Sequence, residues 1–291
     1  MSRRGWFLFC LVGFLWGIPY LFIKVAVDSE DGFSPATVVC LRTAIGAAIL
    51  VPLALRGGQF IAAIKGFKYV ALYALLEMIG PWILIGTAEQ KISSGLTGLL
   101  VASVPIWATL FASMRGDKTV WHHKRLFGIV VGFIGLVAVV GIESFQGSAD
   151  ALSIFMVLIA SIGYSYAVMM VQGALPHVSG IAINALAMLM TAIFYLPWAV
   201  IQWPTHQISE GAIRAVIGLG VLSTGAAFAA FFTLAAIIGV ARGSLVTYLN
   251  TACAVVLGVI ILNEPLTTGI ILGLPLVLIG SYFASRKPVN T

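Results

Sequence analysis

The amino-acid sequence predicts an all-α integral membrane protein with ten transmembrane helices, arranged as two inverted five-helix repeats around a central cavity. Of its 291 residues, 60% are hydrophobic and only 9% are charged, whereas a typical soluble domain carries roughly 25% charged residues. The apolar residues fall into ten runs, each close to the roughly 20 residues that a helix needs to cross a bilayer. The loops between these runs are short, so no soluble catalytic domain is expected.

The ten spans divide evenly between two halves, residues 1–143 and residues 144–291. The expected spans are residues 6–27, 35–55, 67–87, 93–114, 126–142, 151–172, 181–203, 212–235, 243–262 and 268–285. The first run follows Ser2-Arg3-Arg4, but it is too long for the apolar region of a signal peptide and lacks a small-residue cleavage site. It is therefore expected to remain as a membrane span.

The positions of Lys and Arg predict that both termini lie in the cytoplasm. If the N-terminus is inside, only Lys91 and Arg214 fall outside, as the positive-inside rule requires. The bases that then fall inside are Arg3, Arg4, Arg56, Lys65, Lys68, Arg115, Lys118, Lys124, Arg125, Arg242, Arg286 and Lys287. The net charge of +6 suits loops beside an anionic membrane surface, and without an aromatic-basic patch no nucleic-acid partner is expected. The expected location is the inner (cytoplasmic) membrane.

The two halves resemble each other in sequence. AIGAAILVPLAL (44–55) aligns with LMTAIFYLPWAV (189–200), and LFGIVVGFIGLV (126–137) aligns with ILGLPLVLIGSY (271–282), which places Gly128 on Gly273. Because each half has an odd number of spans, the second half starts on the opposite side of the membrane. Inverted repeats of this kind are typical of secondary transporters.

Several segments resemble the drug/metabolite transporter superfamily, EamA type. FLWGIPYLFIK (14–24) and LRTAIGAAILVP (41–52) are similar to its first two helices, and residues 92–118 and 241–267 are similar to its fourth and ninth helices. The chain departs from the family pattern at Cys253, where Pro is frequent, and at Asp117, where Glu is usual. The resemblance implies a ten-helix inner-membrane carrier of small organic metabolites, in a family that includes bacterial exporters of amino acids.

Glu77 is the first candidate for a binding residue. It lies near the midpoint of the third span, where a charge costs at least about 2.5–3.5 kcal/mol on insertion scales. Tyr69, Tyr73 and Pro81 lie at four-residue intervals from it and share its helix face, and Pro81 is expected to bend the helix. Two interpretations stay open. Glu77 either pairs with Arg42 to lock two helices together, or faces the cavity and binds a substrate ammonium or a coupling proton. A Glu77–Arg42 pair that lines the cavity would satisfy both and could clamp the two ends of an amino-acid zwitterion.

The other candidates are aromatic or polar residues within the spans. Trp16 and Tyr20 share one face of the first span, and Lys24 follows at its outer end, where snorkelling beside Asp28 is the simpler explanation. For the other spans, ordinary packing or helix–helix hydrogen bonding is the alternative. The expected substrate-binding residues are Glu77, Tyr73, Arg42, Trp16, Tyr20, Trp107, Tyr164, Tyr248 and Asn250.

No catalytic residue, cofactor or metal site is predicted. The chain lacks the phosphate-binding motif G-x-x-x-x-G-K-[ST], so it is not expected to energise itself with ATP, and its three cysteines are too scattered for a metal site. The expected function is a secondary transporter that exports small metabolites by alternating access, with amino acids, aromatic or otherwise apolar ones included, as the first expectation.

Efflux of lipophilic cationic drugs is the alternative function, and an intramembrane enzyme acting on lipid is a remote one. The expected partners are a small-molecule substrate and the lipid bilayer. Protons as a coupling ion and simple uniport both fit the sequence. Stripes of small residues such as Gly13/Gly17 do not distinguish a monomer from a homodimer.

Overall fold

The computed structural model describes residues 2–145, 150–238 and 245–285, and every regular element within these ranges is a helix. Eight helical segments are long and apolar enough to cross a membrane, and two shorter apolar helices follow them. The expected all-helical membrane protein is therefore confirmed, although its last two spans are shorter than the others. Three of the loop bases counted above, Arg242, Arg286 and Lys287, lie outside the described residues, as do residues 243 and 244 of the ninth expected span.

The spans run in chain order as follows. They are α1 (Arg3–Ala26); α2 (Pro35–Arg56); α4, η1 and α5 (Phe67–Ala74, Leu75–Ile79, Gly80–Glu89); α6 and α7 (Ser94–Val101, Val104–Met114); α8 (His123–Phe145); α9 (Ala151–Ala174); α10 (Gly180–Ile201); α11, η3 and α12 (Glu210–Gly218, Leu219–Ala226, Ala227–Ile238); α14 (Val246–Leu262); and α15 (Thr268–Ser285). The short helix α3 (Phe60–Lys65) and the 3-10 turn η2 (Lys118–Trp121) lie in connections.

Polar side chains set where many of these helices begin. At each of six helix starts, a Ser or Asp side chain accepts a hydrogen bond from the main-chain N–H three residues further on, which satisfies one of the free donors of the first turn. These N-cap residues are Ser2, Ser34, Ser93, Asp150, Ser179 and Ser209. The capping residues therefore separate the apolar spans from the loops.

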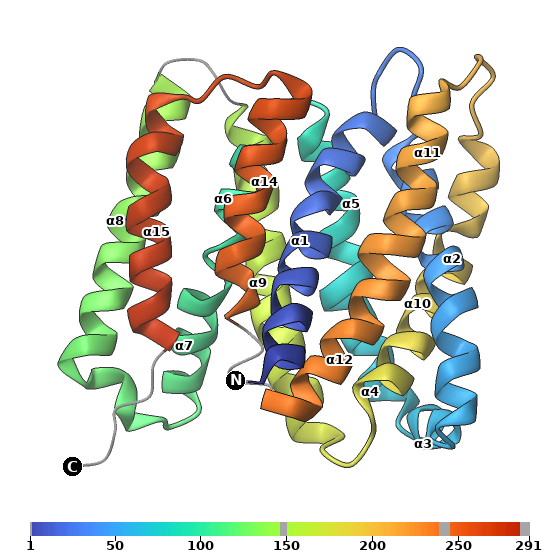
Figure 1. Ribbon diagram of the computed structural model, residues 1–291, viewed down its shortest axis with the longest axis horizontal. Coiled ribbons are helices and arrows are strands. Elements are labelled where there is room, and N and C mark those ends of the chain that lie inside the picture. The colour runs from blue at the N-terminus through green and yellow to red at the C-terminus, as the bar shows by residue number, and fades with distance from the viewer. Residues whose placement is uncertain (1, 146–149, 239–244, 286–291) are drawn as a thin grey trace.

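The first helices of the two halves run in opposite directions. Helix α1 begins at the end of the bundle where α15 ends, at the bottom of Figure 1. We call the opposite end the far end; it carries the loops at residues 28–34, 90–93 and 263–267. Helix α9, which opens the second half, begins at the far end, where Asp150 at its N-cap pairs with Lys91 at 3.7 Å.

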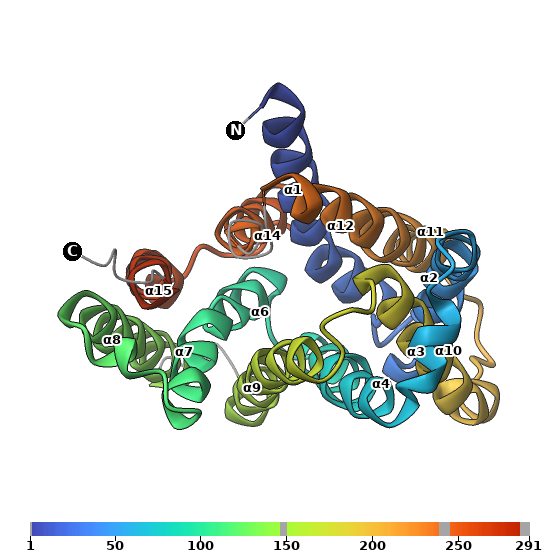
Figure 2. The same cartoon turned by 90° about the horizontal axis from the view of Figure 1, so that it is seen from below.

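Helices of one half pack on matching helices of the other. Helix α2 packs against α10, and α8 packs against α15 along the side of the bundle seen in Figure 2. Helix α1 packs on α14, and α9 correspondingly packs on α6 and α7. The small-residue stripes allow these crossings: a Cβ on Gly280 would lie 2.3 Å from the Cα of Gly132, and one on Gly17 would lie 2.4 Å from the Cβ of Cys253. These stripes thus serve contacts within one chain.

Two spans contain π-helical turns at matching positions. The offset that aligns Gly128 with Gly273 is 273 − 128 = 145, and it moves η1 (75–79) onto residues 220–224, inside η3 (219–226). Such turns leave irregular main-chain bonding and occur frequently at functional sites. The first of them ends at Ile79, two residues before Pro81, which has no N–H to donate. The helix distortion expected near Pro81 is therefore present as a π turn.

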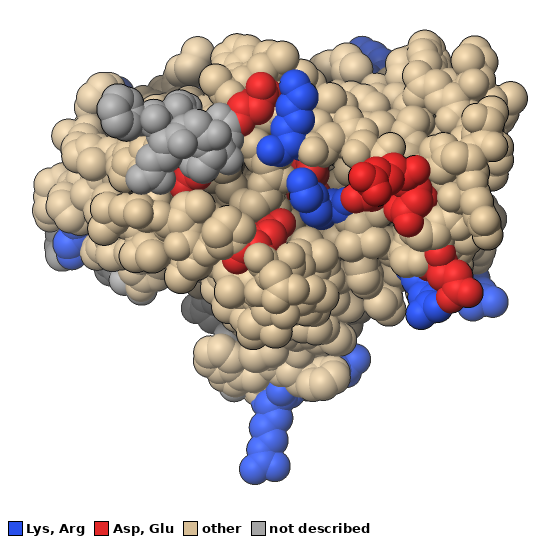
Figure 3. Space-filling view, turned by 90° about the horizontal axis from the view of Figure 1, so that it is seen from above, with Lys and Arg blue, Asp and Glu red and all other residues tan. Residues whose placement is uncertain are grey.

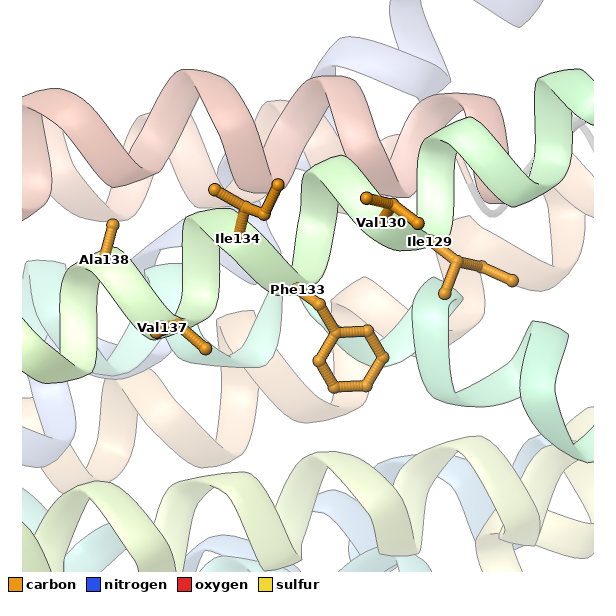
Figure 4. A pocket seen from close by; sticks show the side chains of 6 residues that line it. All are labelled: Ile129, Val130, Phe133, Ile134, Val137 and Ala138. Atoms are coloured by element: carbon orange, nitrogen blue, oxygen red, sulfur yellow. The ribbon is translucent and has the colours of Figure 1, made fainter.

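Two apolar hollows lie on the sides of the bundle. One, of about 510 Å³, lies along α8 beside Ile129, Phe133 and Val137 (Figure 4). The other, of about 500 Å³, lies between α1 and the segment formed by α11 and η3, beside Phe22 and Leu222. Neither lies at the centre of the bundle, so the central cavity expected from the sequence stays a prediction.

Candidate functional site

Arg42 is the base of a polar cluster that forms where α2, α5 and η3 meet. Its side chain is buried on α2, with 5% exposure. One guanidinium nitrogen donates to Thr224 Oγ1 at 3.3 Å, and the guanidinium carbon lies 3.7 Å from the ring centroid of Trp82, a cation–π geometry. Its Nε is buried and has no hydrogen-bond partner among the described residues. Arg42 is thus held on two sides and keeps one donor free.

Glu77 lies on the π turn η1 and is half-buried. Its Oε2 is buried and accepts no hydrogen bond from any described residue. Among the ion pairs of the described residues, none joins Glu77 to Arg42. The locking pair of the first interpretation is therefore absent from this conformation, and the acid and the base each keep unused bonding capacity.

Tyrosines surround these two charged groups. Tyr164 of α9 interacts electrostatically with Glu77, with Arg42 and with Tyr20 of α1. Tyr73 of α4 also faces Glu77, and its hydroxyl donates to Asn184 Oδ1 at 3.1 Å. We call Tyr20, Arg42, Tyr73, Glu77 and Tyr164 the central cluster. The cluster joins residues of both halves.

A glycine brings α9 close enough to complete the cluster. A Cβ on Gly163 would lie 2.7 Å from the carbonyl oxygen of Leu76 in η1, so only a residue without a side chain allows this approach. On the other side of η1, the hydroxyl of Tyr195 donates to the carbonyl oxygen of Ile79 at 2.7 Å. This hydrogen bond serves a carbonyl at the irregular end of the π turn, whose main-chain bonding is incomplete.

The other expected site residues lie in contacts between helices, outside the central cluster. The ring of Trp16 packs on Phe228 and Phe231 of α12. Trp107 packs on Phe133 of α8 and also donates from Nε1 to Ser103 Oγ in its own span at 3.0 Å, and Tyr248 packs against Tyr282. Asn250 accepts a hydrogen bond from Thr251 Oγ1 at 3.3 Å where α1 crosses α14. Tyr69, which was expected on the Glu77 face, is exposed and lies beneath the ammonium group of Lys68.

Two neighbours of Arg42, one aromatic and one acidic, were not predicted from the sequence. Trp82 follows Glu77 by five residues rather than four, which is the shift that a π turn introduces. Glu89 is the last residue of α5, yet it is 0% exposed and neither carboxylate oxygen has a hydrogen-bond partner among the described residues. Its position two residues beyond the expected span 67–87 gave no sign of this burial.

Lys24 does not lie beside Asp28 as expected. Its ammonium nitrogen donates to the carbonyl oxygen of Glu89 at 2.6 Å and to that of Ile92 at 3.0 Å. The Glu89 carbonyl ends α5 and Ile92 lies in the connection that follows, and unpaired carbonyls and the helix dipole at a helix C-terminus favour a cation. Lys24 therefore caps α5 from the neighbouring helix α1.

The comparisons with known proteins agree with a membrane carrier. The model of the EamA-like transporter family matches residues 3–141 and again residues 151–286. The chain is 25% identical over 285 residues to the uncharacterized transporter YoaV of Bacillus subtilis strain 168, covering 95% of this chain and 96% of that protein. It is 26% identical over 288 residues to the uncharacterized inner membrane transporter YedA of Escherichia coli K12, covering 94% and 90%.

A solved crystal structure shares the fold, with a TM-score of 0.67, 15% sequence identity, and coverage of 98% of this chain and 97% of that one. The family model matches each half of the chain separately and leaves few residues uncovered. These matches make the protein a membrane-embedded transporter rather than an enzyme. With its sequence resemblance confirmed, the chain belongs to the EamA-like transporter family.

Proposed function

We propose that this protein is a secondary carrier that exports small metabolites, amino acids first among them, across the cytoplasmic membrane by alternating access. The observation that carries the proposal is that Glu77 and Arg42 lie within membrane spans, unpaired with each other, and that each has a buried polar atom without a partner among the described residues. Charged groups inside a membrane are costly and belong to substrate or ion pathways. A ligand that supplies the missing bonds is therefore favoured.

A zwitterion with an apolar side chain fits this cluster. The planar guanidinium of Arg42 is suited to a carboxylate, and the carboxylate of Glu77 is suited to an ammonium group. The rings of Trp82 and Tyr164, which lie beside Arg42, offer faces for an apolar side chain. An amino acid brings these three features together in one small molecule.

Three observations support alternating access through an inverted repeat. Helices α1 and α9 run in opposite directions, the family model matches the two halves separately, and the π turns η1 and η3 occupy matching positions. In inverted-repeat carriers, two related halves exchange conformations around a central site. Cytoplasmic termini follow from the loop bases, because Arg56, Lys65 and Lys68 lie at the end where α1 begins.

The test is counterflow in proteoliposomes against a panel of the twenty amino acids, with radiolabelled L-phenylalanine as the first probe. Glu77→Gln and Arg42→Gln each remove one charge of the cluster. Glu210→Gln is the matched control, because Glu210 is an exposed acid that pairs with Arg214 on the surface of α11. Losing one charged hydrogen bond is expected to weaken apparent affinity roughly tenfold to a hundredfold, while the control exchanges normally. Absence of counterflow for every amino acid, or normal exchange by both cluster variants, would overturn the proposal.

Efflux of lipophilic cations is the second candidate. The observation that favours it is the half-buried carboxylate of Glu77, which no base neutralises among the described residues and which tyrosine rings surround. Arg42 within the same cluster works against it by repelling a cation. Counterflow of radiolabelled tetraphenylphosphonium in the same vesicles distinguishes the two functions. Only a cation carrier exchanges this compound, and it is expected to lose that exchange when Glu77 is replaced.

A further inference from the structure

We propose that Glu89 is a proton-binding site at the far end of the bundle, which holds its proton in this conformation and releases it when the far end opens. The inference deepens the proposed function and rests on it for the role of the proton, because the bound proton would be the coupling ion of the carrier. It concerns a residue outside the central cluster.

Burial without hydrogen bonds is the first observation. The Glu89 side chain is 0% exposed, and neither of its oxygens accepts a hydrogen bond from a described residue. Glu143 offers a comparison at the same end of the bundle, since it is 1% exposed but accepts a hydrogen bond from the hydroxyl of Thr267. A buried ionised carboxylate needs partners, whereas a neutral carboxylic acid tolerates their absence far better. This environment therefore favours the protonated form of Glu89.

The nearby cations are engaged with other groups. Lys24 of α1 donates to the main-chain carbonyls of Glu89 and Ile92. Arg42 of α2 donates to Thr224 and stacks on Trp82. Both bases are close enough to act on Glu89 electrostatically, but neither forms an ion pair with it among the described residues.

Apart from these two cations, the charged and titratable neighbours of Glu89 do not stabilise its ionised form. Glu264, which follows α14, adds a negative charge close by, and Tyr20 of α1 interacts electrostatically with Glu89 as well. Asp150, the N-cap residue of α9, pairs with Lys91. Glu89 also ends α5, where the helix dipole is negative.

The residues that follow Glu89 in the chain lie at the surface, where its proton would be released. Gln90 and Lys91, which follow Glu89, are exposed at the far end, where acidic and basic side chains gather in Figure 3. When that end opens, the O–H bond of Glu89 breaks, the proton passes to water, and the ammonium of Lys24 can turn from the carbonyls to the new carboxylate. The step forms one ion pair, between Lys24 and Glu89, and needs no further reactant.

The first test needs no substrate and uses infrared spectroscopy of the full-length protein in lipid bilayers during a pH titration. The expected spectrum near neutral pH contains the carbonyl stretch of a protonated carboxylic acid. The Glu89 component of that band is expected to be lost in Glu89→Gln, to move in frequency in Glu89→Asp, and to persist in the matched control Glu143→Gln and in Glu77→Gln. Absence of the band from the wild-type protein, or a band in Glu89→Gln with the same intensity as in the wild type, overturns the proposal.

The second test asks whether this proton drives transport. Proteoliposomes are loaded for L-phenylalanine counterflow at equal pH, and parallel vesicles are given a pH gradient. Glu89→Gln is expected to keep counterflow, because a neutral side chain replaces the protonated acid, and to lose all accumulation driven by the gradient. Accumulation equal to wild type in that variant overturns the coupling role and leaves the carrier function standing. If the wild type exchanges no amino acid, the proposed function fails, and the infrared band alone decides whether Glu89 binds a proton.

Discussion

Removing the carboxylate of Glu264 is expected to weaken the contact between the two halves at the far end. Helix α14 ends at Leu262 and is capped by Asn263, whose φ of 54° is left-handed. The N–H groups of Asn263 and Glu264 both donate to the carbonyl oxygen of Gly258. This turn aims Glu264 at the N-terminus of α6. There it accepts hydrogen bonds from Ser94 N at 2.7 Å, from Ser94 Oγ at 2.9 Å and from Gly95 N at 3.1 Å.

The three bonds set the size of the effect. At about 1 kcal/mol each, Glu264→Ala is expected to cost about 3 kcal/mol of the free energy of unfolding, and Ser94→Ala, which removes only the hydroxyl bond, about 1 kcal/mol. The double variant is expected to cost no more than Glu264→Ala alone, because the Ser94 hydroxyl has lost its acceptor. The resulting coupling energy is therefore about 1 kcal/mol.

The measurement is a double-mutant cycle on the free energy of unfolding, obtained by SDS titration of the protein folded in mixed micelles. Each variant is checked first for a monodisperse folded state. Strictly additive losses, or a loss well under about 1 kcal/mol for Glu264→Ala, would show that the capping contact does not hold α14 to α6.

Two further predictions concern packing and pH. Gly280→Leu is expected to prevent α8 and α15 from packing together, because a Cβ there would lie 2.3 Å from the main chain of Gly132. Gel filtration in detergent should therefore show misfolded protein. The control Gly141→Leu on α8 should elute normally, because nothing lies within 4 Å of its added Cβ. Hydrogen bonds from the hydroxyl and N–H of Ser153 lower the pKa of Asp150, so its stabilising effect is present above the unfolded pKa and lost as pH falls through the folded one. The thermal midpoints of wild type and Asp150→Ala should therefore differ most near neutral pH and converge in acid, and a pH-independent gap would contradict this.

The membrane spans could be predicted from sequence because hydropathy acts locally. Each apolar run must satisfy its own main-chain hydrogen bonds inside the bilayer, so its length and composition already specify a helix. The N-cap residues, such as Ser34 and Ser179, reinforce the boundaries. Helix pairing was harder to predict, because a stripe of small residues such as Gly13/Gly17 on its own did not distinguish contacts within a chain from contacts between chains.

The candidate site was predictable only where a single residue was out of place for its span. Glu77 and Arg42 stood out because charges are rare in membrane spans. Lys24 was misassigned because Asp28 is near in sequence, while the carbonyl oxygens that it caps come from α5. Glu89 was overlooked because its burial depends on helices far away in the chain. These contacts are set by tertiary packing, which no local pattern encodes.

The central claim is that residues beside the cluster are reached from one side of the membrane at a time. The direct measurement is thiol labelling of Ile79→Cys, a half-buried position of η1, in a background without the three native cysteines. A membrane-impermeant reagent is applied to right-side-out and to inside-out vesicles. The predicted result is labelling from both sides. Adding Glu264→Ala is predicted to raise the rate of labelling from the far end. Labelling that occurs from one side only, with or without that second substitution, would contradict alternating access.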